Sequence, residues 1–199
     1  MRLRPTRPDD AAALAEICIR TGHHGQDARA VYDDPALLAE IFVLPYATLE
    51  SPWCWVWEDE AGVAGYIVGT PDTRAFARRT EALWWPRLRR QHPLPAAHDS
   101  SPQAQLHRRL YADVTAGLPF LDSHPAHLHI DLLPRAQGCG WGTQLMATFV
   151  QALQKAGVPG VHLGVSALNP GAVTFYRRVG FEVLQQPAWG LWMGRRFTA

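Results

Sequence analysis

The hydrophobic positions of this sequence recur with two periods, and each period predicts a different kind of element. A period of two predicts strands at residues 3–6, 53–57, 63–69, 128–132 and 161–165, and a final pair at 181–184 and 191–193. Helical spacing predicts helices that begin near residues 10, 35, 73, 106 and 143. Pro86 should bend or break the third helix, and Gly157 should end the last one.

The order of these elements predicts how some of the strands pair. The tryptophans of the segment 53–57 share one strand face, with Cys54 and Val56 on the other. Residues 59–62, Asp-Glu-Ala-Gly, favour a turn, so the strand at 63–69 should complete an antiparallel hairpin. The strand at 161–165 follows a helix and should lie parallel to the strand at 128–132, because a helical crossover joins them.

The stretch from His129 to Met146 has the most specific pattern in the chain, a strand followed by a glycine loop and the start of a helix. Gly138, Gly140 and Gly142 occupy every second position of the loop, where glycine permits a tight turn and leaves the backbone bare. The first N–H groups of the following helix have no partner inside it and lie at the positive end of its dipole. This combination favours a phosphate-binding site over a plain turn.

The spacing of the glycines discriminates among phosphate-binding loops. A P-loop would need a lysine before Thr143, and a dinucleotide fingerprint needs G-x-G-x-x-G where this chain has G-x-G-x-G. The run instead matches Q/R-x-x-G-x-G/A, with Gln137, Gly140 and Gly142 at the specified positions. It thereby resembles the pyrophosphate loop of the GNAT superfamily of acyl-CoA N-acyltransferases. An earlier register that starts at Arg135 also fits, but the distance from the strand favours Gln137.

A second match lies downstream of the loop. Residues 169–182, Asn-Pro-Gly-Ala-Val-Thr-Phe-Tyr-Arg-Arg-Val-Gly-Phe-Glu, resemble the GNAT signature N-x-x-A-x-x-F-Y-x-x-x-G-F. In that family the asparagine follows a strand, and the short helix lies beside the pantetheine arm of CoA. The two motifs occur here in the family's order, with one helix and one strand between them. Together they give a stronger indication than either motif alone.

The resemblance implies a single GNAT acetyltransferase domain over residues 1–199. Its α/β fold would be a mixed sheet that splays open between two parallel strands, with helices on both faces and acetyl-CoA in the split. The backbone of the strand end should pair with pantetheine, and a bulge is expected there. The residues expected to bind the cofactor are Leu132, Leu133, Gln137, Gly138, Cys139, Gly140, Trp141, Gly142, Thr143, Asn169, Ala172, Phe175 and Tyr176.

The middle of the chain resembles a particular branch of the family. The segment 64–73, then Phe76, a run of arginines and residues 84–86, Trp-Trp-Pro, look like the acetyltransferase-like domain of animal O-GlcNAcase. The animal domains have lost the glycine loop, which is intact here. The resemblance therefore implies a free-standing, bacterial-type relative that binds acyl-CoA.

Two residues are the candidates for acid–base catalysis. The resemblance assigns Tyr176 as the acid that protonates the departing thiolate of CoA, although a core aromatic beside Phe175 is the alternative. Asp131 is the candidate base, because a carboxylate in a central strand is costly unless it faces a cleft or has a partner. A buried structural hydrogen bond remains equally possible for Asp131, and His129 on the same face could relay the proton or replace it.

Composition limits the classes of partner and cofactor. A net charge of +1 with 19% charged residues favours neither nucleic acid nor a membrane surface as partner. Three scattered cysteines predict reduced thiols in a cytoplasm, and no Cys/His cluster has zinc spacing, so we expect no metal. The paired histidines His23 and His24 favour a solvated turn. The arginines at 74–90 favour a solvated helix face over a grip on an acidic partner.

Two classes of function follow from these features. The first is direct transfer of an acetyl group from acetyl-CoA to a primary amine, on a small molecule or a protein lysine, by a monomer or homodimer. The second is a module that binds acyl-CoA as a sensor or scaffold and catalyses nothing. Release of thiol from acetyl-CoA in the presence of amines distinguishes the two.

Overall fold

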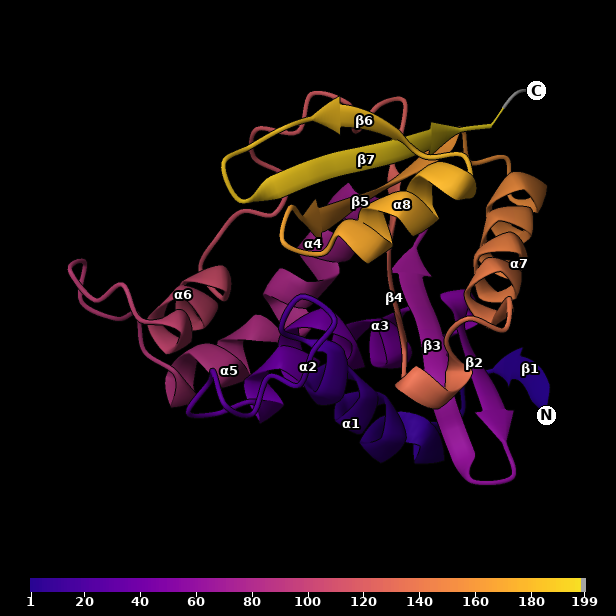
Figure 1. Cartoon of the computed structure of the whole chain (residues 1–199). Coiled ribbons are helices and arrows are strands. Elements are labelled where there is room, and N and C mark those ends of the chain that lie inside the picture. The colour runs from indigo at the N-terminus through magenta and orange to yellow at the C-terminus, as the bar shows by residue number, and fades with distance from the viewer. Residues whose placement is uncertain (198–199) are drawn as a thin grey trace.

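The computed structural model describes residues 1–197, which form one seven-stranded sheet in the order β1-β2-β3-β4-β5-β7-β6 (Figure 1). The strands are β1 (Arg2–Pro5), β2 (Cys54–Asp59), β3 (Gly62–Thr70), β4 (Ala126–Leu132), β5 (Gly160–Ser166), β6 (Glu182–Gln185) and β7 (Gly190–Arg196). All pairs of neighbouring strands are antiparallel except β4 and β5, which run parallel as predicted.

Eight α-helices and three short 3-10 helices connect the strands within residues 1–197. The α-helices are α1 (Ala11–Thr21), α2 (Ala36–Phe42), α3 (Leu44–Leu49), α4 (Thr73–Leu83), α5 (Trp85–Gln91), α6 (Pro102–Arg109), α7 (Trp141–Lys155) and α8 (Pro170–Arg178). The 3-10 helices are η1 (Pro8–Asp10), η2 (Ser51–Trp53) and η3 (Pro134–Ala136). Pro86 breaks the predicted long helix into α4 and α5, and it lies in the first turn of α5, where its missing N–H removes no helical bond.

The sheet opens between its two parallel strands. β4 and β5 pair only through Ala126 with Val161 and His127 with His162. Beyond that point β4 continues along β3 as far as Leu132, while β5 continues along β7. The β5-β7-β6 unit diverges from the other strands in Figure 1. This split confirms the predicted mixed sheet of the GNAT fold.

Helices cover the two faces of the sheet. On one face α7 packs over the hairpin, with Trp55 against Phe149 and Trp57 against Trp141 at ring-centre distances of 6.2 and 5.0 Å. The predicted shared face is thus confirmed for Trp55 and Trp57, whereas Trp53 ends the 3-10 helix before the strand. On the other face α1 packs against β3 and β4. The apolar core residues of both layers are almost completely buried.

Two local predictions were wrong. The helix expected to include Val114 ends at Arg109, and Val114 is exposed. Asp113 accepts hydrogen bonds from the backbone and hydroxyl of Thr115 at 2.8 and 2.7 Å, which stabilises a turn that competes with the helix. The bulge expected at the end of β4 is absent from the described β3–β4 ladder, because β3 supplies successive partners for residues 127–132 and Ala64 accepts from the Leu133 N–H.

Close packing between β3 and α7 gives a first testable prediction. A Cβ at Gly69 would lie 2.5 Å from the Phe149 ring and would clash with the carbonyl oxygen of His127. We expect Gly69→Ala to lower the free energy of unfolding by about 1–3 kcal/mol, measured by urea denaturation. Gly171→Ala in α8 is the control, because its Cβ would meet only Asn169 at 3.8 Å. An unchanged midpoint in Gly69→Ala would contradict this packing.

Candidate active site

The glycine loop leads from η3 into α7 and presents bare backbone. Gly138 and Gly140 have φ values of 75° and 82°, in the left-handed region that favours glycine. A Cβ added at either position would meet nothing within 4 Å, so the space beside the loop is open. The two glycines therefore permit both the tight turn and the close approach of a ligand.

The start of α7 has unsatisfied donors. Gly140 is its N-cap residue and supplies no side-chain cap, and the first turn carries no acidic residue. The helical ladder begins with the bond from Gln144 N–H to Gly140 O at 3.1 Å. The N–H groups of residues 141–143 thus lack a helical partner at the positive end of a 15-residue helix. This end can bind an anion.

Gln137 and Leu133, two of the residues predicted to bind the cofactor, already form hydrogen bonds within the protein. The Gln137 side chain donates from Nε2 to the Leu132 carbonyl at 2.8 Å, and its backbone N–H donates to Pro134 at 3.1 Å. Gln137 therefore anchors the loop to the end of β4. The backbone N–H of Leu133 donates to Ala64 in β3 at 2.8 Å. Leu132 lies beyond the last β4–β5 pair, and its side of the strand faces the split.

The second motif packs against the glycine loop. Asn169 caps α8 by accepting a hydrogen bond from the Ala172 N–H at 3.1 Å. A methyl group at Gly142 would lie 3.4 Å from the Phe175 ring and 3.6 Å from Leu132. The loop, the end of β4 and α8 therefore converge, as the two motifs predicted. The half-buried ring of Trp141 packs on Trp57.

Tyr176 lies in α8 with a buried ring and a free hydroxyl. Its ring packs against Phe175 and Phe181. The hydroxyl has no hydrogen-bond partner within residues 1–197, yet the only buried, unpartnered side-chain atoms there are Thr6 Oγ1 and Trp57 Nε1. The Tyr176 oxygen therefore reaches solvent. Burial and the nearby charge of Asp131 raise the pKa of Tyr176, which keeps its proton in place.

Asp131 faces the side of the sheet covered by α1. Its Oδ2 accepts a short hydrogen bond from the hydroxyl of Tyr66, the residue opposite it in β3. Burial raises the pKa of the Asp131 carboxyl above its usual range, and the bond from Tyr66 opposes this. Oδ1 is not among the enclosed, unpartnered atoms of residues 1–197, and the Thr21 side chain of α1 also acts to lower the pKa of this carboxyl. Asp131 thus has the structural hydrogen bond together with an oxygen that is not sealed in the core.

A directional chain of hydrogen bonds holds His127 and His129. The Thr73 hydroxyl donates to the Pro125 carbonyl at 2.6 Å, so it accepts from His127 Nδ1 at 2.7 Å. Burial and neighbouring histidines lower the pKa of His127 well below its usual value, and its neutral ring must accept at Nε2 from the Tyr46 hydroxyl at 2.7 Å. Each bond therefore fixes the direction of the next.

The chain sets the tautomer of His129. The Tyr46 oxygen, having donated its proton, accepts from His129 Nε2 at 3.3 Å. Burial lowers the pKa of His129 to about 4, so its ring is neutral near neutral pH. With its proton on Nε2, Nδ1 carries a free lone pair that has no partner in the described chain and is not enclosed. His129 lies on the same face of β4 as Asp131, as predicted.

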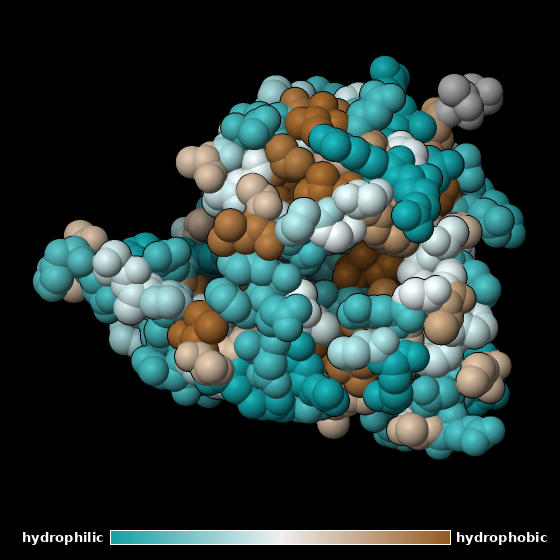
Figure 2. Space-filling model, viewed as in Figure 1, coloured by the Kyte–Doolittle hydropathy of each residue, from teal (hydrophilic) through white to brown (hydrophobic). Residues whose placement is uncertain are grey.

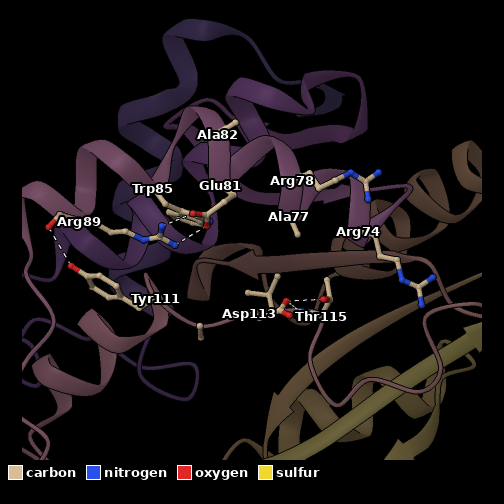
Figure 3. Close-up of a pocket in the computed structure, with 12 residues that line it drawn as sticks. Arg74, Ala77, Arg78, Glu81, Ala82, Trp85, Arg89, Tyr111, Asp113 and Thr115 are labelled. Carbon is tan, nitrogen blue, oxygen red and sulfur yellow. Dashed lines mark hydrogen bonds and ion pairs between the residues drawn. The ribbon is translucent and has the colours of Figure 1, made fainter.

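The hollows of the surface lie in different places, and not all of them adjoin the glycine loop. A recessed apolar area in Figure 2 lies between α7 and α8, at the position of the split in Figure 1. A smaller hollow of about 390 Å³ also lies between these helices, with Thr143 and Arg178 in its wall. A larger one of about 750 Å³ lies between α4, α5 and residues 111–115, apart from the glycine loop (Figure 3).

The arginines of α4 and α5 are mostly neutralised. In Figure 3 Arg89 faces Glu81, with the two side chains 2.5 Å apart at their nearest atoms. Three more pairs follow the same pattern, namely Arg74–Asp122, Arg79–Glu50 and Arg87–Glu40. Within residues 1–197, Arg78 and Arg90 have no such pair. This arrangement favours a solvated face over a site for an acidic partner.

The family follows from comparison with known proteins. Residues 23–181 match the Acetyltransferase (GNAT) family. The chain belongs to this family. The sequence resemblance to GNAT proteins is thereby confirmed, and the family supports acetyl transfer as the general activity.

Individual relatives place the chain within the GNAT family. It is similar to the crystal structure of SsHAT, with 39% identity, a TM-score of 0.93, and coverage of 100% of this chain and 98% of that one. It is 25% identical to rat (Rattus norvegicus) protein O-GlcNAcase over 91% of this chain but only 20% of that protein. The structure of yncA from Salmonella typhimurium with acetyl-CoA shares the fold, with a TM-score of 0.60, 15% identity, and coverage of 100% and 95%.

The GNAT motifs did not predict every residue that shapes this site. Tyr66 and Tyr46 hold Asp131 and His129, and Arg109 lies beside the same face of the sheet. Alternation along β4 was the one available signal, since it placed Asp131 and His129, the partners of these two tyrosines, on one face. No group of three His, Cys, Asp or Glu in residues 1–197 is arranged to hold a metal ion. No helix in this range has the length and apolar character to cross a membrane.

Proposed function

We propose that this GNAT protein transfers an acetyl group directly from acetyl-CoA to a primary amine. One observation supports the proposal: Gly142 of the glycine loop lies against Phe175 and Leu132, the chain neighbours of the candidate acid Tyr176 and the candidate base Asp131. An anion-binding end, an acid and a base are the groups that this reaction needs.

Acetyl-CoA is the proposed cofactor, with its pyrophosphate at the start of α7. The amides of residues 138–143 would hold the phosphate oxygens, while Gln137 positions the loop. Leu132 would pair with pantetheine through its backbone, because the N–H of Leu133 is engaged with β3. Ala172 and Phe175 would flank the pantetheine arm. Arg178 in the hollow beside Thr143 would face a phosphate of the same cofactor.

The amine attacks the carbonyl carbon of the thioester, and loss of the thiolate completes the transfer. Asp131 takes a proton from the amine at its open oxygen, and its raised pKa makes it a stronger base than an ordinary carboxylate. His129 Nδ1 is a second acceptor within the same face. Tyr176 gives its proton to the departing sulfur. No step needs a covalent bond to Cys139, which is exposed in the loop.

The test is a two-part assay on the intact protein. Calorimetry measures binding of acetyl-CoA, and a thiol reagent measures release of CoA in the presence of a broad panel of amines, with acetylated products identified by mass spectrometry. We expect binding and amine-dependent thiol release together. Tight binding of acetyl-CoA without turnover of any amine would favour the alternative, a non-catalytic acyl-CoA-binding module.

A further inference from the structure

Arg109, the last residue of α6, lies at the face of the sheet that carries the candidate base. Its guanidinium carbon lies 5.5 Å from the centre of the Phe42 ring, in a cation–π arrangement. The Phe42 ring lies 5.6 Å from the ring of His129, which belongs to β4. The series Arg109–Phe42–His129 therefore leads from α6 to the strand face that also carries Asp131. Side chains two residues apart on one strand face are about 7 Å apart.

Arg109 is exposed to solvent, with the Phe42 ring beside its guanidinium. Its side chain is exposed to solvent, yet burial lowers the pKa of the guanidinium, and the nearby Tyr32 opposes this shift. Its charge also contributes, after burial, to the lowered pKa of His129. The guanidinium therefore combines access to solvent with partial desolvation by the surrounding protein.

No carboxylate of the described chain neutralises this arginine. Within residues 1–197, Arg109 forms no ion pair and donates no hydrogen bond, whereas four arginines of α4 and α5 each have an acidic partner. A partly desolvated charge without a partner is unfavourable for the free protein. Its five donors in a planar fork are suited to pair with a carboxylate or a phosphate.

A second segment, the connection between α1 and α2, borders the same region. A Cβ at Gly25, in the connection between α1 and α2, would lie 3.2 Å from Asn169 at the start of α8. This connection thus reaches across toward α8 in front of the split (Figure 1). Tyr32, within this connection, and Phe42, at the end of α2, lie near Arg109. Because α6 packs on α2 and α2 on α1, Arg109 lies on the α1 side of the sheet, opposite the glycine-loop helix, where an acceptor would approach.

We propose that Arg109 binds an anionic group of the acceptor, so that the substrate is an amine that also carries a carboxylate or a phosphate. The proposal rests on the N-acetyltransferase function proposed above and specifies its substrate class. Arg109 pairs with the anionic end of such a molecule through charge-assisted hydrogen bonds. This pairing holds the amine end toward the face of β4 that carries His129 and Asp131.

Matched amines test this proposal. Thiol release from acetyl-CoA is measured with O-phosphoethanolamine against ethanolamine and with β-alanine against its amide. We expect kcat/KM of the wild type to favour the anionic member of at least one pair by roughly ten- to a hundredfold, a usual size for hydrogen bonds to a charged group. The two pairs distinguish a phosphate from a carboxylate.

Substitutions assign the preference to Arg109. Arg109→Met keeps an apolar stem on Phe42 and should abolish the preference without changing acetyl-CoA affinity or thermal stability, and Arg109→Lys should restore part of it. Arg78→Met is the matched control, because Arg78 is also exposed, helical and without an ion pair in residues 1–197. This control should keep the preference of the wild type.

The possible failures are distinguishable. If the wild type acetylates amines but does not favour the anionic members, or if Arg109→Met keeps the preference, the role of Arg109 is refuted and the N-acetyltransferase function stands. If no amine supports thiol release although acetyl-CoA binds, the N-acetyltransferase function fails and the acceptor-binding role of Arg109 fails with it.

Discussion

Replacing Gly140 with aspartate should lower the affinity of this protein for CoA by about a hundredfold or more, because like charges brought together at a binding site cost several kcal/mol. A Cβ at this position meets nothing within 4 Å, so the new carboxylate would extend into the open space beside the loop. In our proposal the pyrophosphate occupies that space. The fold should persist, since aspartate is a preferred residue at a helix N-cap.

The controls for Gly140→Asp separate charge from backbone strain. Gly140 has a φ of 82°, so any other residue there is strained. Gly140→Asn introduces the same strain and nearly the same volume without the charge, and it should retain more affinity than Gly140→Asp. Gly157→Asp, at the opposite end of α7 with a φ of 71° and equally open surroundings, should bind CoA as the wild type does.

Calorimetry with CoA measures these affinities, and circular dichroism checks that each variant is folded. Folded Gly140→Asp protein that binds CoA with the affinity of the wild type would show that the pyrophosphate lies elsewhere. A similar loss in Gly140→Asn would show that the backbone conformation of the loop, not its charge, governs binding.

The sequence predicted the parts of this site that depend on local pattern. The period-two strand before the loop, the alternate glycines and the amphipathic helix after it are all contiguous, so neighbouring residues determine them. The split was accessible only through the GNAT resemblance, because it depends on β4 and β5 parting beyond His127. The wrong bulge at the end of β4 has the same origin, since the actual path of β3 determines the ladder there.

Hydrogen-bond partners that come from distant parts of the chain were not predicted. Tyr66 and Asp131 are 65 residues apart, and Tyr46 and His129 are 83 residues apart. No period or motif links such pairs, because the packing of α3 and β3 on β4 brings them together. The same holds for Arg109, which appeared in the sequence only as one basic residue of a short helix. Local pattern and the GNAT resemblance gave the proposed reacting groups, whereas tertiary packing determines their hydrogen bonds and electrostatic surroundings.

Removing the proposed acid and the proposed base should give two different pH profiles. Tyr176→Phe should lower kcat by roughly ten- to a thousandfold, in line with the usual contribution of general acid catalysis. CoA affinity should change little, because the ring keeps its packing. Burial and Asp131 raise the pKa of Tyr176, so the wild-type hydroxyl stays protonated. The loss in Tyr176→Phe should therefore be the same at every pH tested, and Tyr111→Phe, on an exposed tyrosine, should show none.

Asp131→Asn should also lower kcat by roughly ten- to a thousandfold near neutral pH, but its loss should shrink at alkaline pH. The base works only when deprotonated, and burial raises its pKa, so wild-type activity should fall as the pH decreases through that raised value. Asp131→Asn should lack this acidic limb. At alkaline pH more of the acceptor amine is already neutral, and the need for a base declines.

The pH–rate profiles of the two variants, measured with one acceptor at saturating acetyl-CoA, decide between the roles. Asp122→Asn is the control for the change of charge, because Asp122 is exposed and pairs only with Arg74 in the described chain. If Asp131→Asn keeps the limb of the wild type at the same pH and His129→Asn removes it, the base is His129, whose Nδ1 is the other open acceptor on that face. If both Asp131→Asn and Tyr176→Phe turn over as the wild type does, neither residue is catalytic. Transfer would then depend on cofactor positioning by the glycine loop, since alignment of reactants alone supplies a large part of such a barrier.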